Sequence, residues 1–541
     1  MAYRSFLLFC LAALISLAPV DVTRVHAQTG VECGGVDAID YPLDIGDTFE
    51  REFDDFARYR RRFGGRHTGI DLAVKRHGEP VRASANGRVT YANPEGWDTE
   101  KGVVILRHTF PDGSVFYSLY GHMEESADVQ FPPVGACVRR GDVLGLVGDP
   151  SLSLPHLHYE IRNFLPDDGG PGYVLTNPRT SGWFHPLDFT DLWRIRLQPG
   201  FLSSVTLDAA PDLPPVVLDS GAIAAASGPT VSAVVMPDER LWQITAGADI
   251  EGLAALPGGR LAAVTGEGAV SIFEDGRYAA RWSVEAAAAP LVVLGEALIF
   301  AVDDALVAYD AAGNQLWRSL GLYETSAQVM GLTANGVTLA LTVRDAGRYR
   351  WMVVDASGRR VFERDLSRQP VAAPGPLGSW LLLDGADLLR IDGTEAHSLG
   401  STGQTHGRTA TMTVDLVGNS YIYLGDSDST LVALGQAGEL RWRTAYPLQR
   451  APLPPLMATG NGCTLYTLDA DGVLNLFDAN SGELAQQLVL YAGGEDSARP
   501  DARLLKADAN ERLLVGAGFH SIALLNGAAL SPATAAACLS G

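Results

Sequence analysis

The feature that most constrains the fold is a short unit that recurs through the second half of the chain. Each unit is a strand-like run ending near an acidic residue or a glycine, and most units continue into a second strand with an aromatic residue. Repeats of about 40 residues, each holding several short strands, are typical of β-propeller blades. Seven units are countable, starting at Val270, Leu306, Trp351, Leu388, Leu431, Leu474 and Ser521. The count predicts a seven-bladed propeller and leaves six or eight blades open.

The two ends of the repeat region predict how the ring closes. Residues 239–244 stand before the first complete unit without a partner, and the last unit, 521–525, lacks a following strand. We expect these segments to pair, because pairing would remove exposed sheet edges. The units resemble the repeats of quinoprotein-type propellers. This resemblance implies only the fold, since the sequence offers no vicinal cysteine pair or clustered acidic and amide set for a quinone. We therefore expect a binding or scaffold module.

Three short patches in the first third of the chain carry residues suited to metal catalysis. They contain His67 and Asp71, then His122, then His156 and His158. Even spacing allows the first two to share a face, and the last two share a face if the segment is a strand. A catalytic zinc takes three protein ligands and keeps a further position open. Together the patches offer three ligands and two additional imidazoles.

The region from about Tyr41 to Phe189 resembles the lysostaphin/LytM-type zinc metallopeptidases, which cleave peptide crosslinks in bacterial peptidoglycan. The resemblance extends to residues 69–73, 80–89 and 141–148. It implies a domain built on an antiparallel β-sheet, so that the expected fold class of the whole chain is all-β.

Carried over residue by residue, the resemblance implies that His67, Asp71 and His158 hold one Zn²⁺ per chain. It implies that His122 and His156 are the catalytic imidazoles. All five family positions are filled, whereas some LytM-like domains have lost ligands and only activate other hydrolases.

The expected function is therefore a zinc metalloendopeptidase acting on peptidoglycan crosslinks, with the propeller binding a partner or the wall. Zinc would polarise the scissile carbonyl and activate a water. One of His122 and His156 would accept a proton and the other would stabilise the oxyanion or donate to the leaving amine. The sequence leaves open which of the two histidines has which role, and it leaves open which peptide bond is cleaved. Two alternatives are a noncatalytic regulator of cell-wall amidases and a quinoprotein oxidoreductase.

The start of the chain predicts export. Arg4 is followed by an apolar run over residues 6–18 and by small residues up to Ala27. This run is too short to span a bilayer comfortably and has the form of a secretory signal peptide, residues 1–27. No later stretch approaches the ~20 apolar residues of a membrane helix. We expect a secreted protein, periplasmic or extracellular, without a membrane span.

Composition divides the rest of the chain into three parts. Residues 28–195 are the expected peptidase domain. Residues 196–232 are rich in Pro, Ala and Gly and are expected to be a linker. Residues 233–541 contain the repeats and are the expected propeller.

Cysteine content and charge add two expectations. Cys33, Cys137, Cys463 and Cys538 follow the signal segment. An even count in an oxidising compartment favours disulfides, with one bridge in each domain as the simplest arrangement. The net charge of −22 argues against nonspecific binding to nucleic acid or anionic membranes. The expected partners are peptidoglycan peptides and a protein bound by the propeller.

Overall fold

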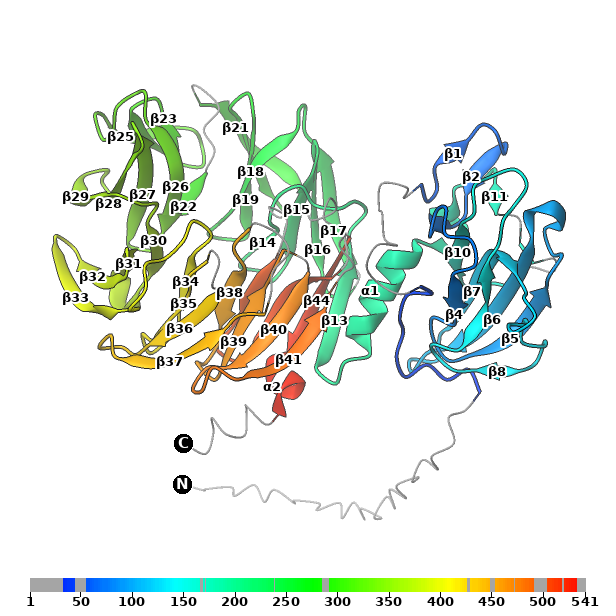
Figure 1. The fold of residues 1–541 in the computed structure, drawn as a ribbon. Helices are drawn as coiled ribbons and strands as arrows, with labels where there is room; N and C mark the ends of the chain where they lie inside the picture. Colours follow the sequence, from blue (N-terminus) through cyan, green and yellow to red (C-terminus); the bar gives the residue numbers. More distant parts are fainter. Residues whose placement is uncertain are drawn as a thin grey trace, which may run out of the picture.

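The fold consists of a sheet domain followed by a ring of small sheets, with one helix between them (Figure 1). The computed structural model describes residues 33–43, 55–165, 169–170, 172–237, 239–284, 291–425, 429–447, 453–470, 472–490, 504–517 and 520–532. The expected signal peptide, 1–27, lies outside them. Strands dominate throughout, so the all-β expectation is confirmed.

The N-terminal domain is built on a nine-stranded sheet in which every pairing is antiparallel. Its path runs β12-β10-β7-β6-β5-β8, with β3 added to β10, and β9 joining β7 to β4. The strands of this sheet are β3 (Ile70–Leu72), β4 (Pro80–Arg82), β5 (Gly87–Asn93), β6 (Gly102–Thr109), β7 (Val115–Glu124), β8 (Cys137–Val138), β9 (Val143–Val147), β10 (Leu157–Arg162) and β12 (Trp183–Phe184).

A small second sheet stands beside the first in the order β1-β2-β11. Its strands are β1 (Tyr59–Arg60), β2 (Gly65–His67) and β11 (Tyr173–Val174). The predicted disulfide within this domain is confirmed, because Cys33 is bonded to Cys137. Cys463 is also disulfide-bonded, and Cys538 lies outside the described residues.

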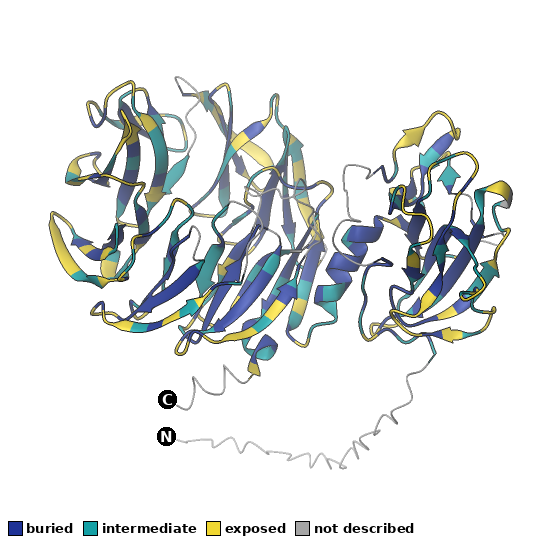
Figure 2. Cartoon of the chain, viewed as in Figure 1, coloured by how far each residue is buried: buried dark blue, intermediate teal, exposed yellow. Residues whose placement is uncertain are grey.

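The central strand β10 is buried along its whole length (Figure 2). Its apolar residues Leu157, Tyr159 and Ile161 belong to the hydrophobic core of the domain. Because successive side chains of a strand point to opposite faces, His158 and Glu160 lie on the other face. The alternation in sequence thus separates the core from the polar face.

The propeller has eight four-stranded antiparallel sheets among the described residues, not the predicted seven. The first four are β14–β17, β18–β21, β22–β25 and β26–β29, with bounds Val216–Val217, Ile223–Ser227, Thr230–Val235, Glu239–Thr245, Ile250–Leu256, Arg260–Thr265, Ala269–Glu274, Arg277–Ser283, Val292–Leu294, Ala297–Val302, Ala305–Tyr309, Gln315–Ser319, Gln328–Ala334, Thr338–Asp345, Arg348–Asp355 and Arg360–Leu366.

The next three sheets are β30–β33, β34–β37 and β38–β41, and the last combines β13 with β42–β44. Their bounds are Val371–Pro374, Trp380–Asp384, Asp387–Asp392, Glu395–Ser401, Thr411–Val414, Ser420–Tyr423, Thr430–Leu434, Leu440–Ala445, Leu456–Thr459, Thr464–Leu468, Val473–Asp478 and Leu484–Val489, then Phe201–Thr206 for β13 and Leu505–Ala507, Arg512–Ala517 and Ser521–Asn526 for β42–β44.

The additional blade, β14–β17, begins within the segment expected to be a linker. Strands β13, β14, β15 and the start of β16 fall within residues 196–232. Alanine-rich β15 (Ile223–Ser227) is mostly buried although its composition is typical of a connection. Its small side chains pack between larger neighbours of the same core, such as Leu261 and Phe273. The composition of this segment therefore led to the wrong prediction of a linker, because small residues can form a core where sheets stack closely.

Ring closure also differs from the prediction. Residues 239–244 belong to β17, which pairs with β16 of its own blade. The final strand β44 pairs instead with β13, so the first propeller strand completes the last blade.

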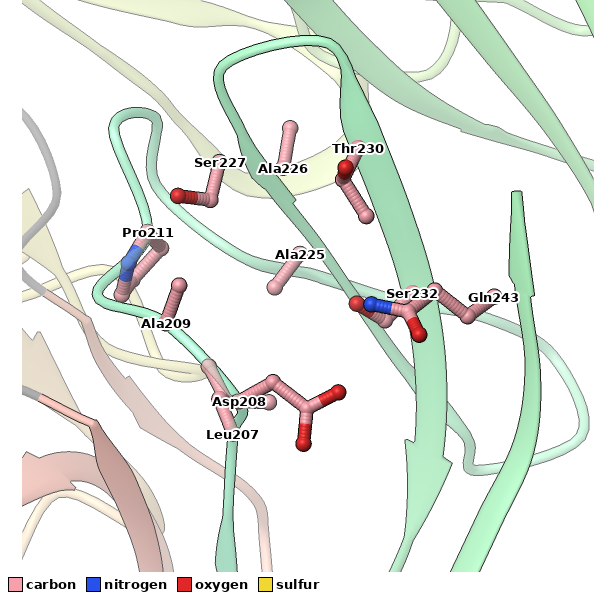
Figure 3. Close-up of a pocket in the computed structure, with 10 residues that line it drawn as sticks. All are labelled: Leu207, Asp208, Ala209, Pro211, Ala225, Ala226, Ser227, Thr230, Ser232 and Gln243. Atoms are coloured by element: carbon pink, nitrogen blue, oxygen red, sulfur yellow. The ribbon is translucent and has the colours of Figure 1, made fainter. Parts of the chain in front are cut away.

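Just after β13 the chain lines a hollow of 110 Å³ with residues of β15 to β17 (Figure 3). Asp208, Ser232 and Gln243 are among its polar residues, and none of the candidate site histidines lines it.

Adjacent blades are locked by tryptophans that lie over glycine turns. The ring of Trp317 lies over Gly358 of the next blade, where a Cβ would come within 2.5 Å of it. Trp442 lies over Gly482 in the same way. The indole N–H of each donates to a carbonyl 2.9 Å away, in Ala356 and Ala479 respectively. The aromatic strands and glycine turns seen in sequence are thus the two halves of one contact between blades.

Helix α1 (Pro186–Arg196) joins the two domains. Leu187, Phe189 and Trp193 pack in the core of the N-terminal domain. Ile195 packs in a propeller core together with Leu525 of β44. The helix is therefore part of both domains.

We predict that Val205→Asp lowers the propeller's melting temperature strongly. Val205 is 1% exposed in β13 and shares a core cluster with Ile223 and Ile522. Burying an unpaired carboxylate there should cost several kcal/mol, about 3 or more. Thermal unfolding followed by tryptophan fluorescence measures the change. Leu202→Asp is the control, because Leu202 is 48% exposed in the same strand; equal shifts in both variants would contradict closure through β13.

Candidate metal centre

Backbone pairing brings the three histidine patches together. In the ladder of β10 with β3, His158 lies opposite Asp71. In the ladder of β10 with β7, His158 lies opposite Gly121, the neighbour of His122. His67 ends β2, three residues before β3 begins. The sheet register therefore places the residues of all three patches around His158.

Three of the predicted residues form a compact cluster of donor atoms. His67, Asp71 and His158 each offer one atom, and these atoms lie within 4.8 Å of one another. Asp71 Oδ1 is 3.3 Å from His67 Nε2 and 3.5 Å from His158 Nδ1. The two imidazole nitrogens are 2.9 Å apart.

Outer carboxylates determine which nitrogen of each imidazole faces this cluster. His67 donates through Nδ1 to Asp55 Oδ1 at 2.6 Å, which leaves its Nε2 lone pair facing inward. His158 donates through Nε2 to Glu160 Oε1 at 2.9 Å, which leaves Nδ1 facing inward. Hydrogen bonds of this kind orient the histidine ligands of protein metal sites and fix their tautomers.

The donor set fits a zinc ion. Two imidazole nitrogens and one carboxylate oxygen converge on a single point, an arrangement that a cation between them, either a proton or a metal ion, would stabilise. Asp71 Oδ1 is also buried without a hydrogen-bond donor among the described residues. Donors bound to zinc at about 2.0–2.1 Å in a tetrahedral arrangement lie about 3.3 Å apart. The two Asp71 distances match this value, and the imidazole pair needs only a slight opening.

The other two predicted residues lie beside the cluster. His156 Nε2 is 3.4 Å from Asp71 Oδ1, and the rings of His122 and His156 are 4.4 Å apart. Each imidazole donates through Nδ1 to a backbone carbonyl at 2.7 Å, Glu100 for His122 and Leu154 for His156. Both therefore keep Nε2 for other partners.

Local charge favours a cation at the cluster. Burial lowers the pKa of His67, but Asp71 and Asp55 outweigh burial and raise that pKa to about 10. Burial raises the pKa of Asp71, but His67 and the other imidazoles hold it well below its usual value. Burial, together with repulsion from the neighbouring imidazoles of His156 and His158, lowers the pKa of His122 to about 3. Burial lowers the pKa of His156, but Asp71 outweighs it and raises that pKa overall.

The His122 segment has a backbone shaped for the site. His122 has a φ of 59°, in the left-handed region that is rare outside glycine and is often found at functional residues. Its neighbour Gly121 faces Trp97, whose ring would lie 2.4 Å from a Cβ at that position. The indole in turn contacts the rings of His122 and His158 edge to face. Glycine is thus required here by close packing against the tryptophan.

Sequence reasoning did not identify Asp55 or Glu160. The carboxylate of Glu160 is fully buried, pairs with Arg162 at 3.2 Å, and accepts from the Trp183 indole at 3.0 Å. Burial raises its pKa, but Arg162 and His158 outweigh burial and lower it to about 2. The one available signal was position, since Glu160 lies two residues after His158 and therefore on the same face of a strand. Nothing in the sequence around Asp55 indicates its contact with His67.

An antiparallel-sheet domain with a cluster of His and Asp donor atoms, joined to a propeller, is the arrangement that the fold and site define. Two family models match within it. Residues 65–171 match Peptidase family M23, and residues 222–375 match the model described as outer membrane protein assembly factor BamB. The chain therefore joins a domain that matches the model of Peptidase family M23 to a propeller that matches the BamB model.

Solved structures of other proteins are similar to a large part of the chain. BamB from Moraxella catarrhalis is 19% identical in sequence, with a TM-score of 0.45. The match covers 60% of this chain and 99% of the BamB chain. Sqt1 from Saccharomyces cerevisiae shares 12% identity with a TM-score of 0.43, covering 60% and 98%. The designed protein Ika8 shares 12% with a TM-score of 0.46, covering 60% and 99%. No curated protein matches the chain.

We predict that Asp55→Asn weakens zinc binding by about 10- to 100-fold, the usual effect of losing an outer partner of a metal-binding histidine. The amide keeps the size of the carboxylate but removes its charge. Titration against a competing chelator measures the affinity, and the melting temperature reports folding. Asp112→Asn, which alters an exposed turn of the same domain, should leave affinity unchanged. Wild-type zinc affinity in the Asp55→Asn protein would show that Asp55 does not contribute to metal binding.

Proposed function

We propose that this protein is an exported zinc endopeptidase that hydrolyses the peptide crosslinks of peptidoglycan. The observation that carries the proposal is the convergence of His67 Nε2, His158 Nδ1 and Asp71 Oδ1 in one cluster of an M23 domain. His67, Asp71 and His158 would hold the metal. His122 and His156, whose rings lie 4.4 Å apart beside that cluster, would be the catalytic imidazoles.

Zinc held there would supply a Lewis acid that polarises the scissile carbonyl and makes a water more acidic. The two imidazoles would handle the protons. Each commits Nδ1 to a backbone carbonyl, so Nε2 is the nitrogen that can accept or donate a proton. One would accept the proton of the attacking water. The other, protonated at Nε2, would stabilise the oxyanion or donate to the leaving amine.

The propeller would serve as a binding module for a protein partner or a wall component. This role fits a BamB-like repeat module. Export into the periplasm fits the apolar segment that begins the sequence. No helix among the described residues is long and apolar enough to cross a membrane.

Incubation of the purified mature protein with crosslinked sacculi tests the proposal directly. Mass spectrometry of the released fragments should identify a cleaved peptide bond between stems, and chelation of the metal should abolish the release. A protein that binds zinc, releases nothing, and instead stimulates a cell-wall amidase would be a regulator, and the endopeptidase proposal would be rejected.

We predict that His67→Ala, Asp71→Ala and His158→Ala each remove zinc and hydrolysis together. A site with three protein ligands loses much of its coordination when any one is removed. Metal content per chain and muropeptide cleavage are the two measurements. His77→Ala is the control, since His77 is an exposed histidine of the same domain paired with Glu124. Stoichiometric zinc in all three variants would refute the ligand assignment.

We predict that His122→Ala and His156→Ala keep zinc but lose most turnover. Positioned acids and bases typically contribute about 10² to 10⁴-fold to rate, and neither residue belongs to the donor cluster. Turnover on a soluble crosslinked muropeptide and metal content are measured together. If His156→Ala loses the metal while His158→Ala retains it, the roles of these two histidines are exchanged.

A further inference from the structure

The hairpin of β1 and β2 concentrates positive charge in an acidic chain. The chain has 63 acidic and 41 basic residues, yet nine positions of this hairpin, 58–66, hold five arginines and no acid. These are Arg58, Arg60, Arg61, Arg62 and Arg66. The first four are exposed and the last is partly buried. Like charges gathered on one short hairpin repel one another, so an anion bound there would relieve that cost.

The hairpin is tied to the candidate metal centre through His67. The backbone N–H of His67 donates to the carbonyl of Arg58 at 3.0 Å. Tyr173 stacks on the His67 ring with centroids 5.0 Å apart, and Phe63 of the hairpin turn stacks on Tyr173 at 4.5 Å. Three stacked rings therefore connect the arginine-bearing turn to a proposed zinc ligand.

The hairpin also reaches the loop that precedes His156. Arg62 Nη2 donates to the carbonyl of Leu152 at 2.5 Å, and the carbonyl of Leu154 in the same loop holds His156. The side chains of Leu152 and Leu154 are 54% and 55% exposed. The border of the site is therefore cationic on the hairpin and apolar on the loop, which suits a peptide that carries both carboxylates and aliphatic side chains.

Two of the five arginines keep their guanidinium groups available. The other three are engaged within the protein. Arg60 forms an ion pair with Asp55 at 2.5 Å. Arg62 and Arg66 donate hydrogen bonds to the backbone carbonyls of Leu152 and Ala57, respectively. Arg58 and Arg61 make no side-chain hydrogen bond or ion pair with any other described residue, and both are exposed.

We infer that this hairpin recognises carboxylates of the substrate peptide, with Arg58 and Arg61 as the specificity-determining contacts. The inference rests on the proposed endopeptidase function and adds the chemical class of the substrate: a stem peptide with free carboxyl groups. A guanidinium binds a carboxylate through two parallel hydrogen bonds with full charge, whereas a carboxamide offers one acceptor and no charge.

The test uses two crosslinked muropeptides of the same sequence, one with free stem carboxyls and one with these converted to carboxamides. The double variant Arg58→Gln/Arg61→Gln should lower kcat/KM on the free acid about tenfold, mainly through KM, and leave the carboxamide nearly unchanged. The effect should shrink at high salt, because exposed charges are screened. Metal content and melting temperature should stay at wild-type values.

Arg88→Gln/Arg139→Gln is the matched control, since it removes two exposed positive charges of the same domain beside β8, at the other end of the sheet path from β10. It should leave both substrates unaffected. Equal cleavage of the acid and the carboxamide by the wild-type protein, or an equal loss on both in the hairpin variant, would overturn the inference while leaving the endopeptidase function standing.

Binding of the two muropeptides, followed by fluorescence anisotropy, separates the two claims. If neither is cleaved but the free acid binds about tenfold more tightly and loses this preference in the hairpin variant, recognition by the hairpin stands and the hydrolytic function fails. If the two peptides bind equally, the hairpin inference is wrong.

Discussion

Pairing of β10 with β3 on one side and β7 on the other is the constraint on which the candidate site depends. It fixes His158 opposite both Asp71 and Gly121, and strand alternation then directs Tyr159 into the core. A slip of one residue would exchange the two faces and bury the imidazole in apolar surroundings. The hydrophobic core therefore holds the register, and the register holds the donor atoms in place.

Charge balance around the site follows from this arrangement. The two outer carboxylates each have an arginine partner, Arg60 for Asp55 and Arg162 for Glu160. Among the described residues, Asp71 forms its ion pairs with the imidazoles of His67, His156 and His158. Because the arginines offset the outer charges, the carboxylate that remains for a cation is the one inside the donor cluster. The outer carboxylates orient the imidazoles, and the inner carboxylate would attract a cation.

Much of this could be predicted from the sequence, and the failures have physical causes. The set His67, Asp71 and His158 was predicted from a family resemblance, and its convergence depends on β2 and β3 belonging to different sheets that meet at β10. Asp55 was missed because its contact depends on packing between distant segments. The repeats predicted a propeller, since each blade carries its own strand pattern. The blade formed by β14–β17 was missed because β15 is built largely of alanine, which indicates a linker by composition and becomes core only when neighbours stack on it.

Closure of the propeller by β13 has a consequence for the order of events during synthesis. The paired residues Thr206 and Ser521 are 315 positions apart, so β13 leaves the ribosome long before its partner exists. The sheet domain can fold as soon as it emerges, while the ring must wait for the C-terminal strands. Any product cut short near its C-terminus would present β13 as an unsatisfied edge, ready to pair with another chain. Completion of the ring therefore depends on strands β42–β44, which end at Asn526.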